Sequence, residues 1–167
     1  ASPFPSFDLI STYDIAIWTE PSVGPAYLGA NALLTSYMNA GGKLFISGDS
    51  IGQYDRFAGL GSASWWQSHL KAKLLTETAA DTPIIGVNST LFSGLNITLD
   101  GVDSAENQDT IDVATRKAQA PFTEPIFTTA IDGESYPVGL QAGQCDPYNI
   151  VYLGFGLEGV NGQNTRN

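Results

Sequence analysis

The segment Gly48-Asp49-Ser50-Ile51-Gly52 has the residue types and the spacing of a nucleophile elbow. This motif, G-x-S-x-G, is a sharp strand-to-helix turn that lifts a catalytic side chain above a sheet. It directly follows the apolar run 43–47, which predicts a buried strand. Glycine accepts positive φ and close backbone approach at little cost, so the two flanking glycines suit such a turn. The chemistry that the pattern supports is nucleophilic attack by the Ser50 hydroxyl.

Catalysis by Ser50 would also need a base, because a serine hydroxyl is a weak nucleophile on its own. The chain has one histidine, His69, in a predicted helix over residues 62–71. α/β-Hydrolases place the histidine late, after the acid, whereas His69 precedes most of the acidic residues. One hypothesis is therefore a serine hydrolase with Ser50 and His69. The alternative is that His69 is a partly exposed helix residue and that Asp49 and Ser50 cap the helix after the elbow.

The elements that must position these residues are predicted to form an α/β unit. Residues 13–18 and 43–47 predict strands, and an apolar helical face ending at Gly41 lies between them. Short strand–helix–strand connections make right-handed parallel crossovers. The strongest late strand covers 149–155. We therefore expect a three-layer α/β sandwich with a mostly parallel sheet.

Ligand sites in such sheets lie beyond the carboxyl ends of the strands. That rule places Glu20, Asp49, Ser50 and Glu158 near one crevice.

Composition narrows the class of protein. The 167 residues suit a single domain over 1–167, with 43% hydrophobic residues to form a core. The formal net charge of −10 argues against nucleic acid and anionic membranes as partners. No apolar run approaches the ~20 residues needed to span a bilayer. Few lysines, many small polar residues and a single cysteine favour a secreted microbial protein. We expect this cysteine, Cys145, to be a buried thiol, and the alternative is that it pairs with a segment outside this chain.

Four segments together resemble a known fold. They are Tyr-Asp-x-x-Ile-Trp at 13–18, Tyr-Met-Asn-Ala-Gly-Gly-Lys-Leu at 37–44, Ile-Ser-Gly at 46–48 and Leu-Gly-Phe-Gly-Leu-Glu-Gly at 153–159. The chain resembles class I glutamine amidotransferase-like domains, which are flavodoxin-like. It is most similar to extracellular domains of unassigned activity in large secreted bacterial proteins, often alongside proteases. The resemblance covers most of 8–166 and implies that the partners are other domains or chains of the same precursor.

The resemblance also implies a degenerate catalytic triad. Active amidotransferases carry a cysteine in the middle of the elbow, where this chain has Ser50. They carry a histidine and a glutamate two residues apart after the last core strand, where this chain has Gly156 and Glu158. Glycine offers no base, so amidotransfer by the usual triad is excluded. We therefore expect a non-catalytic accessory or binding domain, with the Ser50 hydrolase as the alternative.

Residues 100–120 are polar and acidic and predict a long loop. Asp100, Asp103 and Asp109 supply the oxygen ligands that calcium prefers, although their spacing is not that of a helix-loop-helix calcium site. A solvated acidic loop is the alternative. Tryptophans are candidates for a carbohydrate- or peptide-binding platform. Because Trp65 and Trp66 are adjacent on one helix, we expect at least one of them to be exposed or to cover an edge.

The ends of the chain suggest that the domain is incomplete. A proline-rich start leads directly into a strand of buried type, and no covering helix follows the last strand. Parallel sheets need helices on both faces. We therefore expect the chain to be a fragment of a longer folded unit, with a partner for strand 13–18 supplied by another segment or chain.

Overall fold

One half of the main sheet is parallel. The computed structural model describes residues 4–20, 30–53, 63–88, 90–116 and 122–162. Strands β1 (Ile15–Glu20), β2 (Lys43–Gly48) and β9 (Asn149–Leu153) run parallel, with β2 in the middle. The predicted pairing of the first two strands is therefore present. Helix α2 (Asn31–Asn39) connects β1 to β2 and buries Leu34, Tyr37 and Met38.

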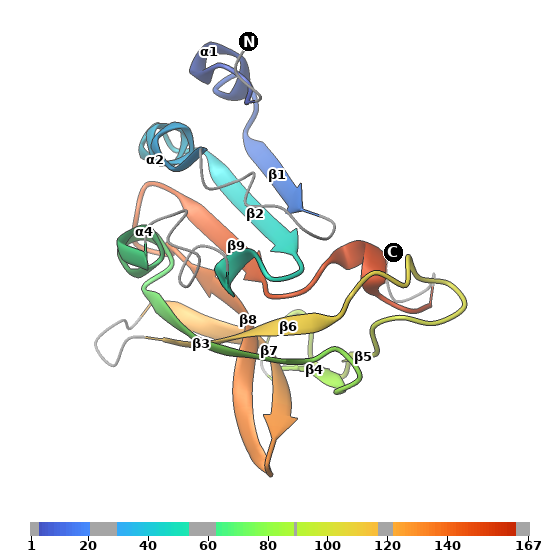
Figure 1. Cartoon of the computed structure of the whole chain (residues 1–167). Helices are drawn as coiled ribbons and strands as arrows, with labels where there is room; N and C mark the ends of the chain where they lie inside the picture. Colours follow the sequence, from blue (N-terminus) through green and yellow to red (C-terminus); the bar gives the residue numbers. More distant parts are fainter. Residues whose placement is uncertain (1–3, 21–29, 54–62, 89, 117–121, 163–167) are drawn as a thin grey trace.

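The other half of this sheet is antiparallel. The strand order is β1-β2-β9-β8-β7-β4-β5, and β8 (Glu134–Ala142), β7 (Thr123–Ile131), β4 (Ile84–Gly86) and β5 (Asn96–Ile97) each run antiparallel to their neighbour. A separate antiparallel ribbon joins β3 (Ala72–Ala79) to β6 (Thr110–Arg116). In Figure 1 this ribbon crosses in front of the main sheet, and the β7–β8 hairpin projects from the body.

The prediction of a three-layer sandwich with a mostly parallel sheet is wrong. Strands outweigh helices, and the seven-stranded sheet is mixed and curled. Besides α2, the longest helix in the described ranges is α4 (Ala63–His69); α1 (Phe7–Ile10) and the 3₁₀ turn η2 (Leu157–Gly159) are shorter. The sequence carries a hairpin signal between β7 and β8. Asp132 and Gly133 both have positive φ, at 52° and 83°, which is typical of an Asp-Gly hairpin turn.

The predicted loop over 100–120 is also wrong in its second half, because β6 begins at Thr110. Four consecutive residues of β6, Ile111 to Ala114, are buried. Side chains of a strand alternate between its faces, so both faces of β6 are covered. The acidic composition of the segment concealed a strand that lies inside the molecule.

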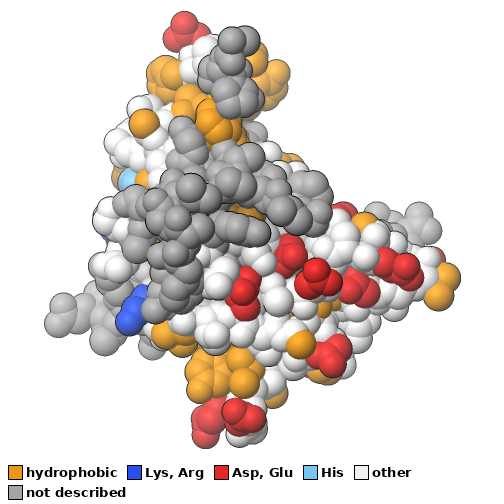
Figure 2. Space-filling model, in the orientation of Figure 1, with side chains coloured by type: hydrophobic (Ala, Val, Ile, Leu, Met, Phe, Trp, Pro, Cys, Tyr) orange, Lys and Arg blue, Asp and Glu red, His pale blue; other side chains and the backbone are white. Residues whose placement is uncertain are grey.

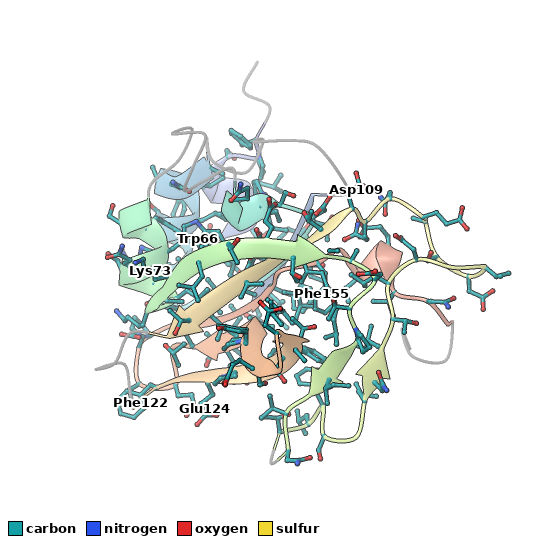
Figure 3. The ribbon with its side chains drawn as sticks, turned by 60° about the horizontal axis from the view of Figure 1, so that its bottom comes forward. Trp66, Lys73, Asp109, Phe122, Glu124 and Phe155 are labelled. Carbon is teal, nitrogen blue, oxygen red and sulfur yellow. The ribbon has the colours of Figure 1, made fainter. Side chains whose placement is uncertain are left out.

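Two hydrophobic clusters make up the core, and β6 contributes to both. The first contains Ala114 and the side chains of α2 and α4, and the second contains Ile111 and Val113. Figure 3 labels Trp66 from the first cluster and Phe155 from the second. The ribbon therefore contributes to both clusters, as β8 and β9 of the main sheet also do.

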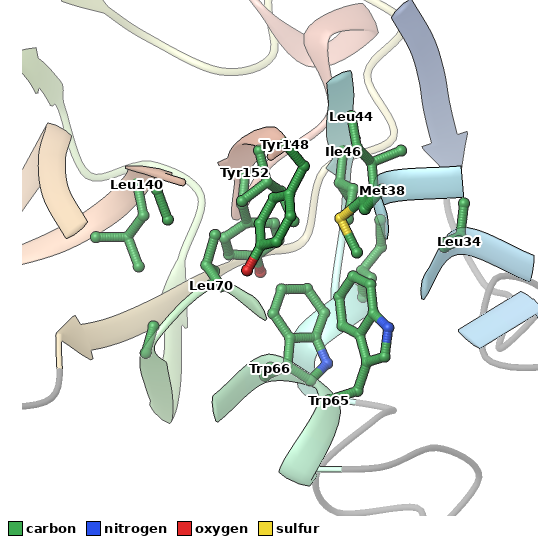
Figure 4. Close-up of a cluster of buried hydrophobic side chains, with 14 of the residues drawn as sticks. Leu34, Met38, Leu44, Ile46, Trp65, Trp66, Leu70, Leu140, Tyr148 and Tyr152 are labelled. Atoms are coloured by element: carbon green, nitrogen blue, oxygen red, sulfur yellow. The ribbon is translucent and has the colours of Figure 1, made fainter. Parts of the chain in front are cut away.

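Both neighbouring tryptophans of α4 are buried, contrary to expectation. Trp65 is 6% exposed and Trp66 is 1% exposed. Trp66 packs edge-on against Tyr152 with ring centroids 4.8 Å apart (Figure 4). The Trp65 indole N–H donates to Thr35 Oγ1 of α2 at 3.1 Å. Each ring fills a different gap, so neither forms a surface platform.

The surface carries an exposed cysteine and many acidic side chains. Cys145 is exposed, so the expected buried thiol is wrong; it lies in the turn between β8 and β9. Acidic side chains are spread over the face seen in Figure 2, where few basic ones appear. None of the helices in the described ranges is long and apolar enough to cross a membrane.

Candidate functional site

The elbow has the sharp turn that its motif predicts. Strand β2 ends at Gly48, Asp49 and Ser50 form the turn, and residues 51–53 are helical. The left-handed residue is Ser50 itself, with φ of 56°. The flanking Gly48 and Gly52 do not have positive φ, so glycine does not supply the turn in the expected way. A left-handed conformation costs a non-glycine residue about 1–2 kcal/mol, and contacts elsewhere must hold Ser50 in it.

Ser50 is held by a carboxylate and a second hydroxyl. Its Oγ donates to Asp49 Oδ1 at 3.1 Å and lies 3.0 Å from Thr110 Oγ1. Thr110 Oγ1 also lies 3.1 Å from Asp49 Oδ1 and 3.1 Å from Glu77 Oε1. These residues come from the elbow, from the start of β6 and from β3. The ribbon therefore places a polar cluster directly against the candidate nucleophile.

The carboxyl beside Ser50 is buried among like charges. Asp49 is 9% exposed, and burial raises its pKa above the usual value. Hydrogen bonds from Ser50 and Thr110 oppose that rise, while the charges of Glu77 and Asp109 add to it. Asp49 therefore favours its protonated form more than an exposed aspartate does. A base that activates serine must accept its proton, and this cluster supplies only carboxylates for that task.

The strongest electrostatic feature near the elbow is Asp112 of β6, which the sequence analysis did not single out as a site residue. Its Oδ2 accepts 2.6 Å hydrogen bonds from the Tyr152 hydroxyl and from the Gly52 N–H, and its Oδ1 accepts a 3.1 Å bond from the Gln53 N–H. Complete burial raises its pKa to about 7 despite these donors, and the charge of Glu77 adds to the rise.

Asp112 thus occupies the position where an anion would bind. Unpaired N–H groups at a helix N-terminus form a ready anion site, and this carboxyl takes two of them, at Gly52 and Gln53. A side chain at position 52 would collide with Leu74 and approach Asp112 Oδ2 to 3.0 Å. The second glycine of the elbow motif therefore makes room for the ribbon rather than for a substrate.

The segment after β9 has its own network at the same sheet edge. Ser47 Oγ donates to the Phe155 carbonyl at 2.9 Å and accepts the Leu157 N–H at 3.0 Å. The Gly156 N–H donates to Gln108 Oε1 at 2.6 Å, and Gln108 Nε2 donates to Glu158 Oε1 at 3.2 Å. These bonds tie the turn after β9 to the end of β2 and to the residues that precede β6.

Gly156 stands where the resemblance places a catalytic histidine. A Cβ atom added at position 156 would overlap the Glu158 carboxylate. The half-buried Glu158 side chain folds back over Gly156. In a working triad, a histidine at position 156 would stand between this glutamate and the nucleophile. The space for a base at this position is therefore already filled.

His69 belongs to a different part of the molecule from the elbow. Its Nε2 lies 3.3 Å from Thr35 Oγ1, and its ring packs on Trp65 and Tyr148 with centroids 5.1 and 5.7 Å apart. Burial lowers its pKa, and Lys71 lowers it further. Among the residues that the structure describes, the hydrogen-bond partners of Ser50 and the contacts of His69 have no member in common, so these contacts do not assemble the hypothetical Ser50–His69 pair.

A groove of about 510 Å³ lies between α2 and α4, on the side of His69. None of its lining residues carries a permanent charge: Asn31, Ala32, Thr35, Ser36, Ser64, Trp65, Ser68 and His69. The buried Oδ1 atom of Asn31 accepts no hydrogen bond from the described residues. In a chain with a net charge of −10, this neutral, hydroxyl-rich surface is distinctive.

The proposed calcium ligands do not meet in one group. Asp100 Oδ1 accepts the Gln108 N–H at 3.4 Å, the Asp103 N–H donates to Asn161 Oδ1 at 3.4 Å, and Asp109 contributes to the field at Asp49. Over the described ranges, no three acidic, histidine or cysteine side chains are placed to hold a metal ion. Calcium binding stays a prediction.

Glu20 is in register with Gly48 at the end of β1, which places its backbone beside the elbow; its side chain is outside the description. Neither a protein-family model nor a curated protein matches this chain.

Proposed function

We propose that this chain is a non-catalytic accessory domain of a secreted multidomain protein, in which an elbow of catalytic type has become a structural joint. The observation that carries the proposal is the environment of Ser50. Its hydroxyl contacts the carboxyl of Asp49 and the hydroxyl of Thr110, and within the described part of the chain neither an imidazole nor an amine is hydrogen-bonded to it. A serine without a base remains a weak nucleophile.

Two further contacts support this reading. Glu158 fills the space above Gly156, where a base would have to stand. Asp112 occupies the Gly52 and Gln53 N–H groups of the helix after the elbow. The resemblance to class I glutamine amidotransferase-like domains, secretion and association with a protease remain part of the proposal.

The test is a comparison of turnover by the unaltered chain and by Ser50→Ala. We expect no glutaminase activity on L-glutamine, and equal background rates on p-nitrophenyl acetate and on a p-nitroanilide. Gln144→Ala, an exposed change away from the elbow, serves as the matched control. A rate that disappears only in Ser50→Ala would overturn the proposal.

The competing function is a serine hydrolase with Ser50 as nucleophile. It predicts covalent labelling by a fluorophosphonate probe, detected as a mass increase on the peptide that contains Ser50. We expect no labelling, because the contacts of Ser50 provide no group that removes its proton efficiently. Stoichiometric labelling would establish the hydrolase and replace the accessory-domain proposal.

A ligand for this domain fits best in the groove between α2 and α4. Its uncharged hydroxyl and amide lining matches a neutral carbohydrate better than a charged peptide. Titration with cellohexaose, chitohexaose and maltohexaose, followed by the ¹H–¹⁵N resonance of the Trp65 indole, would test this. We expect saturable shifts that Ser68→Arg abolishes. Unchanged groove resonances with all three sugars would remove the carbohydrate proposal and leave the non-catalytic proposal intact.

A further inference from the structure

Strand β1 is the outer strand of the main sheet, and one side of its backbone is not paired with any described strand. The Lys43 N–H donates to the Asp14 carbonyl at 3.0 Å, so the polar groups of Asp14 face β2. Along a strand, the backbone N–H and C=O groups of successive residues point alternately to its two sides. The N–H and C=O groups of Ile15 and Ile17 therefore point away from β2, toward the open edge.

The side chains along this edge are apolar and exposed. Tyr13, Ile15 and Ile17 are 60%, 58% and 69% exposed, and their odd-numbered positions place them on one face. The opposite face carries Ala16 and Trp18, which pack against the first hydrophobic cluster. Folded proteins usually protect an edge strand with lysine, proline or a bulge. Residues 15–19 contain no proline or charged residue, and the β1–β2 register is regular.

We propose that β1 pairs edge to edge with β1 of a second copy of this chain, antiparallel, about a two-fold axis that passes beside Ala16. In this register Ile15 lies opposite Ile17 of the second copy, and Ile17 lies opposite its Ile15. Both residues have outward-pointing N–H and C=O groups, so each pair exchanges two hydrogen bonds. The four isoleucines meet on one face of a continuous sheet.

The pattern of residues favours this register over the one centred on Ile17. Moving the axis to Ile17 would place Asp14 directly opposite Glu20 of the second copy, and facing like charges destabilise an antiparallel pair. If the axis lay between two residues, each residue with outward-pointing N–H and C=O groups would lie opposite one whose groups point toward β2. The two strands could then not exchange hydrogen bonds. With the axis at Ala16, Asp14 faces Trp18 and Tyr13 faces Thr19. The edge is thus complementary to itself, as a two-fold interface requires.

The net charge of −10 opposes association of two copies. Because the contact is made by backbone hydrogen bonds and isoleucine side chains and contains no ion pair, added salt screens the repulsion between the two copies without weakening the contact. The dimer is therefore expected to tighten as salt rises. An interface built on ion pairs would respond in the opposite direction.

The first experiment is sedimentation velocity of the whole chain up to roughly 100 µM, where mass action favours a dimer. We expect a dimer that Ile17→Lys and Ile17→Pro both convert to monomer. The Ile17 N–H points outward, so proline there removes an edge bond without removing a bond to β2. Ile85→Lys, at the 43% exposed isoleucine of β4, is the matched control and should remain dimeric. A wild-type monomer at this concentration, or a dimer that survives both Ile17 variants, would overturn the proposal.

The second experiment fixes the register. Ala16 of each copy forms a non-hydrogen-bonded pair, in which Cα atoms lie about 4.5 Å apart. That separation is within the range that a disulfide bridges. In a Cys145→Ser background, Ala16→Cys should therefore oxidise to a covalent dimer, whereas the exposed Asp132→Cys should not. A dimer in solution without this cross-link would reject the proposed pairing.

Discussion

The Tyr152 hydroxyl donates a 2.6 Å hydrogen bond to Asp112 Oδ2, and this contact joins the buried strand β9 to the ribbon strand β6. The same oxygen accepts the Gly52 N–H, so one carboxyl links the sheet, the ribbon and the elbow. The elbow therefore owes its position to a residue that comes long after it in the chain.

Asp112 should make the protein less stable as pH rises. Its folded pKa of about 7 lies above the ordinary value of 3.8, so the folded state binds the proton more tightly than the unfolded state. Between these two values the free energy of unfolding should fall by about 1.4 kcal/mol per pH unit from this group. The raised pKa of Asp49 acts in the same direction.

Urea unfolding at several pH values between 4 and 8 measures this slope. Asp112→Asn should flatten it, whereas the exposed Asp103→Asn should leave it unchanged. An unchanged slope in Asp112→Asn would contradict the assignment.

Removing the Tyr152 hydroxyl should destabilise the chain while keeping the ring. Tyr152→Phe retains the edge-on contact with Trp66 but leaves Asp112 without one of its donors. Losing a partner of a buried polar group costs about 1–3 kcal/mol. The missing donor should also raise the pKa of Asp112 further, because the bond from Tyr152 lowers it. Chemical denaturation and a carboxyl NMR titration check the two effects, and a stability equal to wild type would count against this contact.

Substitutions at Ser50 should separate backbone strain from hydrogen bonding. Ser50→Ala loses the contacts with Asp49 and Thr110 and keeps the strained φ of 56°. Ser50→Gly loses the same contacts but relieves the strain. We expect the glycine variant to be more stable than the alanine variant by about 1 kcal/mol, measured by thermal and urea unfolding. Equal stability of the two variants would show that the turn is not held as described.

A side chain at position 156 should displace the Glu158 carboxylate. Gly156→Ala places a methyl group against the end of this flexible side chain, which must shift and lose its hydrogen bond from Gln108 Nε2. The expected cost is that of one such bond, about 0.5–1.5 kcal/mol. In the double variant with Glu158→Ala, the added cost of the Gly156 change should largely disappear. A double-mutant cycle measures this coupling. Additive effects would mean that the two residues do not compete for the same space.

The parallel half of the sheet was predictable because its signals are local. An apolar strand, a helix with an apolar face and a second apolar strand follow one another with short connections, and β1, α2 and β2 form as expected. The elbow followed from five consecutive residues.

The antiparallel direction of the other strands and the position of the ribbon were not predicted, because both depend on residues far apart in the sequence. Asp112 looks like one more acid in a polar stretch, and only the docking of β6 beside Tyr152 and the elbow gives it a role. Two adjacent tryptophans cannot both lie on the same face of a helix. The burial of Trp65 depends on α2, where Thr35 accepts its indole N–H. The Asp132-Gly133 turn joins β7 to β8 as an antiparallel hairpin, and this local signal is evidence against a mostly parallel sheet.

The hydrogen bonds that Asp112 accepts at the N-terminus of the elbow helix also bear on when this helix reaches its native structure during folding. The capped N–H groups belong to Gly52 and Gln53, and sixty residues separate Gly52 from the carboxyl that binds it. Closing so long a loop costs entropy before any contact repays it, and such distant pairings slow folding. We therefore expect the turn around Ser50 to reach its final form only after β6 has docked. Hydrogen exchange at these two amides would report completion of the whole core rather than formation of a local helix.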